Sequence, residues 1–247
     1  MAYVPSRYCR YIEPFAGSAS LFFASNPKES ILSDTNQALI EMYRTLMQHP
    51  LILARQVYSY PNDAATYYHL RDSEVENGHT LDKAARFIYL NRHCFNGVYR
   101  TNKKGRFNVP RGTRTGAVPS SQVFFRCSYL LRRATLMSLD FEQCLSSAKA
   151  GDFVYLDPPY SSQTRTCYGE YGYNCFSPAD HGRLIECLHR LDRIGAMFLL
   201  SYSDRSDLVT SLNPTWYCSR LSVRRHVAGF ASHRDFGSEI LVSNFHK

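Results

Sequence analysis

The stretch Phe153-Val154-Tyr155-Leu156-Asp157-Pro158-Pro159-Tyr160 decides the fold. The apolar run from Phe153 to Leu156 predicts a short buried strand, and the two prolines end it because proline fixes φ and has no N–H. A stiff loop follows, carrying the Asp157 carboxylate, a bare carbonyl and the Tyr160 ring. Open α/β sheets bind ligands at the carboxyl ends of their strands, so we expect a ligand site at this loop.

The N-terminal part of the chain predicts the opening of the same sheet. A strand at Cys9–Glu13 is followed by the turn Pro14–Ser18, which contains Gly17, and by a helix. A second strand at residues 31–33 ends on Asp34, and a helix follows at residues 38–48. A strand, a glycine turn, a helix, a strand and an acid, in this order, are typical of a parallel doubly wound sheet. The single glycine excludes the dinucleotide fingerprint, and Asp34 by itself fits either a ribose ligand or a helix cap.

From residue 50 the pattern changes to helices alone, which indicates an inserted module. Helices are expected at 51–58, 66–75 and 81–92, before a segment at 94–112 that is rich in Asn, Gly, Lys and Arg. Asn102-Lys103-Lys104-Gly105 predicts a hairpin turn. The α/β alternation then returns. Strands are expected at 136–139, 153–156, 196–201, 216–223 and 239–243, and helices at 141–148, 178–193 and 204–212. We therefore expect a catalytic domain of residues 1–49 and 130–247 and an inserted module of residues 50–129.

Composition favours a reduced, cytosolic protein with a polyanionic partner. The net charge is +8 and the sequence pI is about 9.1, which favours nucleic acid as the partner. The eight cysteines form no CxxC pair, so we expect neither a zinc site nor a disulfide framework. No signal peptide or apolar run of membrane-spanning length is visible in the sequence.

The motifs together resemble the N6-adenine DNA methyltransferases. The resemblance rests on Glu13-Pro14-Phe15-Ala16-Gly17-Ser18, Asp34-Thr35-Asn36 and Asp152–Tyr160. The segments Tyr89–Arg100, Gly105–Pro110 and Phe236–Asn244 are similar to the Dam-like group. The resemblance implies an α/β fold: a Rossmann-like methyltransferase sheet that binds S-adenosylmethionine (AdoMet), with an inserted, mainly helical DNA-recognition module carrying a hairpin loop.

The resemblance also implies the residues of the cofactor and catalytic sites. Asp34 would hold the ribose hydroxyls of AdoMet, Phe153 would pack on its adenine ring, and Asp157 would lie near the methionine end and the target amine. The full expected cofactor set is Glu13, Phe15, Gly17, Asp34, Asn36, Phe153 and Asp157, and the expected catalytic set is Asp157, Pro158 and Tyr160. No metal ligand is expected.

In the inserted module, the resemblance implies contacts with double-stranded DNA. Phe95 and Asn96 would enter the duplex beside a flipped adenine, and Arg100 would read a guanine edge. Val98 and Pro110 would pack on thymine methyl groups, and Asn102 would add a polar contact. Phosphate contacts are expected from Lys103, Lys104, Arg106, Arg111 and Arg114. The usual target of the group is GATC. A solvated basic loop is the alternative reading of this segment.

The residues Asp157, Pro158 and Tyr160 suit methylation of an amine. The lone pair of an exocyclic adenine amine is conjugated with the ring, so the amine is a poor nucleophile. The Asp157 carboxylate and the Pro158 carbonyl can accept both of its N–H bonds, while Tyr160 can stack on the base. Alignment of the amine and fixed dipoles would supply most of the rate, without a covalent enzyme intermediate.

One element of the family pattern is missing. A Gly-Gly-Lys element usually precedes the glycine turn, whereas Met1–Arg10 contains neither Gly nor Lys. The leading hypothesis is a site-specific DNA adenine-N6 methyltransferase of a bacterial or phage-infected cell, acting at the nucleoid, either solitary or in a restriction-modification system. The alternative is a catalytically weak Dam-like DNA-binding protein that needs a partner chain to complete its AdoMet pocket. A small-molecule or RNA methyltransferase is the third possibility.

Overall fold

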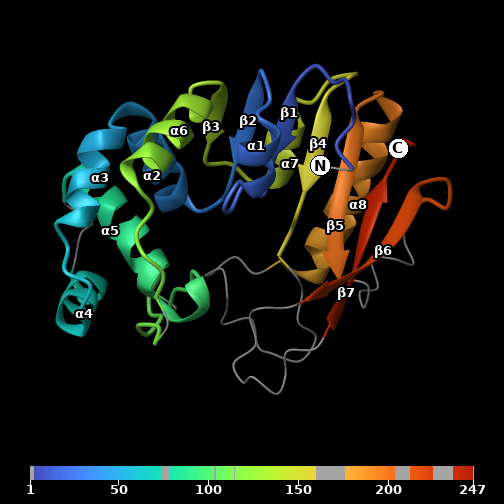
Figure 1. Ribbon diagram of the computed structural model, residues 1–247. Helices are drawn as coiled ribbons and strands as arrows, with labels where there is room; N and C mark the ends of the chain where they lie inside the picture. Colours follow the sequence, from blue (N-terminus) through green and yellow to red (C-terminus); the bar gives the residue numbers. More distant parts are fainter. Residues whose placement is uncertain are drawn as a thin grey trace. The chain divides into compact units, whose positions relative to one another are not determined.

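The chain folds into two compact units (Figure 1). The computed structural model describes residues 3–73, 78–102, 104–113, 115–159, 176–203, 212–224 and 236–246. The first unit contains the described residues up to Thr35, those from Leu139 to Pro159 and those from Phe176 onward. The second unit contains the described residues from Asn36 to Ser138.

A mixed β-sheet forms the centre of the first unit. Its strands lie in the order β2-β1-β4-β5-β7-β6. Their bounds are β1 Tyr11–Glu13, β2 Ser30–Ser33, β4 Phe153–Leu156, β5 Met197–Ser203, β6 Tyr217–Arg224 and β7 Phe236–Ser243. β2, β1, β4 and β5 are parallel neighbours, whereas β7 is antiparallel to both β5 and β6. The mixed α/β fold is consistent with a Rossmann-like methyltransferase sheet.

The order of the strands places a topological switch point between β1 and β4. From β1 the chain moves to β2 on one side of the sheet, and it later returns to β4 on the other side. Ligands of open α/β sheets bind in the crevice beyond the carboxyl ends of the strands at such a point. Val154 pairs with Ile12 and with Phe198, and all three side chains are fully buried. The β4 strand predicted at residues 153–156 has the predicted bounds.

Three helices of the first unit follow the predicted pattern. They are α1 Ser20–Ser25, α7 Phe141–Leu145 and α8 Pro178–Arg193. Ser177 and Asp180 form a capping box at the start of α8, and Leu184, Leu188 and Leu191 are buried along one face. α7 and α8 lie on the same face of the sheet (Figure 1). The helix predicted at 204–212 lies outside the described residues except for its last position.

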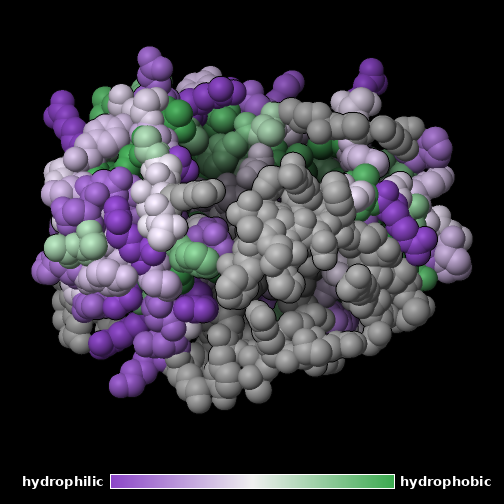
Figure 2. Space-filling view, turned by 60° about the horizontal axis from the view of Figure 1, so that its bottom comes forward, coloured by the Kyte–Doolittle hydropathy of each residue, from purple (hydrophilic) through white to green (hydrophobic). Residues whose placement is uncertain are grey.

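The second unit is mainly helical. Its elements are α2 Gln37–Gln48, α3 Pro50–Tyr58, α4 Ala64–Asp72, α5 Thr80–His93, the 3-10 helix η1 Phe95–Gly97, α6 Ser121–Leu131 and β3 Ala134–Met137. Tyr67 and Tyr89 pack with Leu90, Phe107 and Val109 in a buried cluster. Hydrophilic side chains cover much of the surface of this unit, at the left of Figure 2. The sequence did not predict α6. The expectation that residues 50–129 form the recognition module stays a prediction.

The described residues contain neither a helix that is long and apolar enough to cross a bilayer nor a cluster of three or more potential metal-binding side chains.

Candidate active site and nucleic-acid interface

Three acidic residues follow the carboxyl ends of neighbouring parallel strands. Glu13 is the last residue of β1, Asp34 follows β2, and Asp157 follows β4. Because the three strands are parallel, these residues meet at one edge of the sheet. Burial raises the pKa of Glu13, and the charges of Asp157 and Asp34 raise it further. The carboxyl groups of Asp157 and Asp34 are therefore close enough to Glu13 to act on its ionisation, whereas their role in cofactor binding stays a prediction.

Asp34 also holds the glycine turn between β1 and α1. The Gly17 amide donates to Asp34 Oδ2 at 3.0 Å, and the Ala16 amide donates to the Ser33 carbonyl at 2.9 Å. Gly17 has a φ of 46°, in the left-handed region that a residue without Cβ adopts readily. A carboxylate has about four acceptor positions, and this hydrogen bond occupies one of them.

Glu13 is buried and carries a proton near neutral pH. Glu13 is 3% exposed, and the Tyr11 hydroxyl donates a hydrogen bond to Glu13 Oε2 at 2.9 Å. Burial is the largest cause that raises the pKa of Glu13 to about 8, whereas the Tyr11 hydrogen bond lowers it. The carboxyl group of Glu13 can therefore donate a hydrogen bond as well as accept one.

Asp157 leads directly into the stiff proline loop. Its side chain reaches solvent, yet the surrounding protein restricts its hydration. The restricted hydration of the carboxyl group, together with the charge of Glu239 on β7, raises the pKa of Asp157 to about 6. Pro158 is buried and Pro159 half-buried. At neutral pH the site offers an ionised carboxylate beside a proline carbonyl. The third predicted catalytic residue, Tyr160, lies outside the described residues.

Aromatic rings gather beside the glycine turn. Phe15 stacks on Phe141 with their ring centroids 5.3 Å apart, and the Phe176 ring lies 6.0 Å from Phe15 and 5.9 Å from Phe141. The sequence reading missed Phe141 and Phe176. A signal was present for Phe141, because Asp140-Phe141 follows a predicted strand just as Asp34 does. Phe141 and Phe176 are buried, and the half-buried Phe15 is the ring of this group that remains accessible to a flat ligand.

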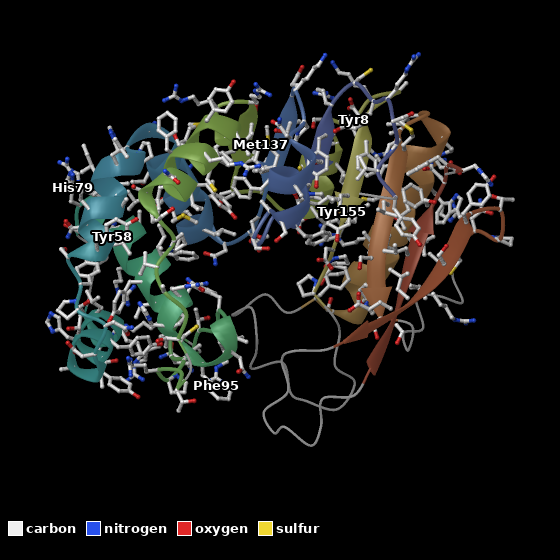
Figure 3. All side chains as sticks on the ribbon, in the orientation of Figure 1. Tyr8, Tyr58, His79, Phe95, Met137 and Tyr155 are labelled. Atoms are coloured by element: carbon white, nitrogen blue, oxygen red, sulfur yellow. The ribbon has the colours of Figure 1, made fainter. Side chains whose placement is uncertain are left out.

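Phe153 lies away from this group of rings. It is the first residue of β4, four positions before Asp157, or about 13 Å along a strand. The residue is fully buried, and its ring contacts those of Tyr8, Tyr11 and Phe245. Figure 3 shows Tyr8 near one end of the sheet and Tyr155 farther along β4. The structure therefore does not bring Phe153 to the edge formed by the carboxyl ends of the strands.

Arg183 on α8 connects the aromatic rings to three carboxylates. Its guanidinium group binds Asp140, Glu142 at 2.8 Å and Asp180 at 2.8 Å. The same group lies 4.6 Å above the centre of the Phe141 ring. These contacts fix α7 against α8 and limit the movement of Phe141 beneath Phe15.

Asn36 has a structural contact of its own in the second unit. Its side-chain oxygen accepts from the Leu39 amide at 3.2 Å and so caps α2. The structure thus shows Asn36 as a helix cap. Its predicted contact with the cofactor stays a prediction.

The predicted DNA-inserting residues follow α5 in the second unit. Phe95 is 40% exposed and lies at the end of α5, as Figure 3 shows. Its amide donates to the Pro110 carbonyl at 2.8 Å. Asn96, with a φ of 56°, and Gly97, with a φ of 65°, both adopt the left-handed conformation and turn the chain. An apolar ring and an amide side chain are therefore presented on a firmly held turn.

The segment after this turn forms a hairpin that closes at the predicted position. Bridges join Cys94 to Arg111 and Thr101 to Phe107. Asn102 Oδ1 accepts from the Lys104 and Arg106 amides at 2.9 and 3.1 Å, and Gly105 has a φ of 74°. Because this oxygen caps the turn, the Asn102 side chain has a structural contact besides its predicted DNA contact.

Basic residues surround the hairpin, and the sequence from Cys94 to Gly116 contains no acidic residue. Arg100 Nε donates to Asn108 Oδ1 at 3.0 Å, and Val98 is half-buried. Lys104 and Arg106 are exposed. Arg111 instead donates to the side-chain and main-chain oxygens of Asn62, so it also anchors the hairpin. Lys103 and Arg114, two predicted phosphate contacts, lie outside the described residues.

Known proteins resemble this chain over most of its length. A sequence model of the D12 class N6 adenine-specific DNA methyltransferases matches residues 1–226. The type II methyltransferase M1.LlaDCHI of Lactococcus lactis subsp. cremoris is 32% identical, over 98% of this chain and 88% of that protein. The DNA adenine methylase of Serratia marcescens is 31% identical, over 87% and 80%. The retron Ec67 DNA adenine methylase of Escherichia coli is 28% identical, over 94% and 82%.

Proposed function

Because the chain belongs to the D12 class of N6 adenine-specific DNA methyltransferases, we propose that it methylates adenine N6 within a short, specific sequence of duplex DNA, with AdoMet as the methyl donor. The observation that carries this proposal is the meeting of Glu13, Asp34 and Asp157 at the switch point of the sheet, beside the glycine turn. GATC is the proposed target, because the segment from Phe95 to Pro110 resembles the Dam-like group.

The residues at this edge fit AdoMet chemically. Asp34 lies at the carboxyl end of β2, where an acidic residue can bind ribose hydroxyls, and the Phe15 ring, packed on Phe141 and Phe176, suits an adenine base. The ionised Asp157 carboxylate suits the positive sulfonium and amino groups of the cofactor. When bound, AdoMet supplies an electrophilic methyl group. We place Phe15, packed on Phe141 and Phe176, rather than Phe153, against the adenine ring, because Phe153 lies at the start of β4, away from the carboxyl ends of the strands.

Asp157 and Pro158 would position the amine of the target base. The carboxylate and the proline carbonyl accept its two N–H bonds, which orients the nitrogen and increases its electron density. After methyl transfer, the surplus proton leaves to the Asp157 carboxylate or to water. A pKa of about 6 keeps this carboxylate mostly ionised at neutral pH. Tyr160 would stack on the base.

The hairpin of the second unit would bind and read the DNA. Phe95 and Asn96 would occupy the space left by the flipped adenine, which leaves the duplex at a cost of a few kcal/mol. Arg100 would bind a guanine edge, Val98 and Pro110 would contact thymine methyl groups, and Asn102 would add a polar contact. Lys104 and Arg106 would bind phosphates, so affinity would fall as salt increases.

The proposed function can be tested in cells and with the purified chain. DNA from cells that lack other adenine methylation but express this chain would be sequenced for N6-methyladenine, and AdoMet binding would be measured by isothermal titration. We expect methylation at a single short motif and saturable AdoMet binding. If the purified chain binds no AdoMet, the chain does not act alone, and a partner-dependent protein is the better account. Methylation of RNA without methylation of DNA would overturn the proposal.

A further inference from the structure

We propose that Asn108 is a positioning residue, which holds the Arg100 guanidinium group so that its terminal nitrogens face a guanine in the major groove. The inference rests on the proposed function, in which Arg100 reads a base. Asn108 itself would not contact that base. Its effect on sequence recognition would act entirely through Arg100.

The two residues are paired through both their main chains and their side chains. The main-chain amide of Asn108 donates to the main-chain carbonyl of Arg100 at 3.1 Å, and Arg100 Nε donates to the side-chain oxygen Oδ1 of Asn108 at 3.0 Å. The Thr101–Phe107 bridge and the turn capped by Asn102 lie directly beyond this pair. Both side chains therefore start from a fixed part of the hairpin, where the hydrogen bond from Nε to Oδ1 restricts the orientation of the guanidinium group.

The contact with Asn108 uses only Nε of Arg100, so the two terminal nitrogens of the guanidinium group can still donate to a base. A guanidinium group is planar and has five N–H donors. Nε uses one of them on Asn108, and the four on the terminal nitrogens can make the two parallel bonds to guanine O6 and N7. A long arginine side chain samples many rotamers, so fixing its plane before binding reduces the entropy lost when both bonds form.

An amide suits this position better than a carboxylate. No acidic residue occurs between Cys94 and Gly116, so no carboxylate of the hairpin itself competes with DNA for the Arg100 guanidinium group. An aspartate at position 108 would still accept from Nε, but its charge would weaken binding to the phosphates. The other asparagine near the turn, Asn102, uses its oxygen on the Lys104 and Arg106 amides. Because Asn102 caps the turn, the contact between the Asn108 side chain and Arg100 is not explained by a capping role.

The test uses the sequence mapped by methylation and replaces its guanine by 7-deazaguanine, which lacks the N7 acceptor. One bidentate arginine–guanine pair discriminates by about 1–3 kcal/mol, so we expect about a tenfold lower kcat/KM for the wild-type protein on the modified duplex. Asn108→Leu should lower kcat/KM on the normal duplex about tenfold and reduce the 7-deaza penalty to about twofold. Asn108→Asp should restore most of the penalty, while its DNA binding should be weaker than that of the wild-type protein and fall less steeply with salt.

Two further variants separate the possible outcomes. Arg100→Ala should remove the 7-deaza penalty, and Asn213→Leu, the same change at a turn of the first unit, should retain it. If Arg100→Ala keeps the penalty, the base-reading role in the proposed function is wrong. If Arg100→Ala removes it but a folded Asn108→Leu protein, with wild-type AdoMet affinity, keeps it, only the positioning role is wrong. Rescue by Asn108→Asp distinguishes orientation of Arg100 from a merely structural effect.

Discussion

The raised pKa of Asp157 predicts an acidic limit to activity that an ordinary aspartate would not produce. Burial and the charge of Glu239 raise the pKa of Asp157 to about 6. The proposed chemistry needs the ionised carboxylate, because only that form offers both oxygens as acceptors to the target amine. Activity should therefore fall as pH decreases through 6. Glu239→Gln removes the neighbouring negative charge, so it should move this limit to lower pH.

The size of the effect follows from the fraction of Asp157 that is ionised. With a pKa of about 6, that fraction is about 0.9 at pH 7 and about 0.1 at pH 5. An aspartate with an unperturbed pKa of about 3.9 would still be about 0.9 ionised at pH 5. The wild-type protein should thus lose activity about ninefold between pH 7 and pH 5, and Glu239→Gln should lose less.

The assay is kcat/KM for AdoMet, measured from pH 5 to pH 8 at saturating DNA. This ratio reports ionisation before the cofactor binds, so the positive charge of AdoMet does not alter the pKa being measured. Glu186→Gln, the same change on the exposed face of α8, is the matched control and should retain the wild-type limit. A rate that stays constant down to pH 5, or equal limits for Glu239→Gln and the wild-type protein, would refute the reasoning.

Three other changes test the packing of the site. Glu13 binds its proton more tightly in the folded protein, so stability should decrease as pH rises from 4.5 to about 8, and Glu13→Gln should remove that decrease in thermal melts. Gly17→Ala meets no steric obstacle, since the nearest atom is 4.0 Å away, but a φ of 46° should cost about 1–2 kcal/mol in urea unfolding and weaken AdoMet binding. Arg183→Met removes contacts with three carboxylates but keeps an apolar stem over Phe141, so it should destabilise by about 1 kcal/mol in urea unfolding, less at high salt.

Each of these changes has an outcome that contradicts its reason. A Glu13→Gln protein whose melting temperature follows pH as the wild-type protein does would show that Glu13 ionises without cost. Wild-type AdoMet affinity in Gly17→Ala would separate the glycine turn from the cofactor site. If Arg183→Met is as stable as the wild-type protein at low salt, the contacts that Arg183 makes between α7 and α8 provide no net stabilisation.

The strand ends of the site were predictable because local sequence signals mark them. Apolar runs of strand length end on Glu13, Asp34 and Asp157, and the parallel topology follows from the alternation of strands and helices. The turn at Asn102–Gly105 was also predictable, since its chemistry lies within four residues. For these features the local pattern and the tertiary structure agree.

Other features depend on contacts that the local sequence does not specify. The direction of β4 places its first residue, Phe153, at the end opposite to Asp157, although both belong to one motif. Phe176 follows no predicted strand, so only the structure brings its ring beside Phe15 and Phe141. The protonated state of Glu13 follows from its burial beside Tyr11, and the Arg100–Asn108 contact follows from the register across a turn. These features required the three-dimensional structure.

The most direct test of the central claim is methyl transfer by Asp157→Ala compared with the wild-type protein, using labelled AdoMet and duplex DNA. The modified base would be identified after digestion of the DNA, and duplex binding would be measured for both proteins. We predict N6-methyladenine with the wild-type protein, and none with Asp157→Ala at nearly unchanged DNA affinity. N6-methyladenine formed by Asp157→Ala at the wild-type rate would contradict the role assigned to the carboxyl end of β4.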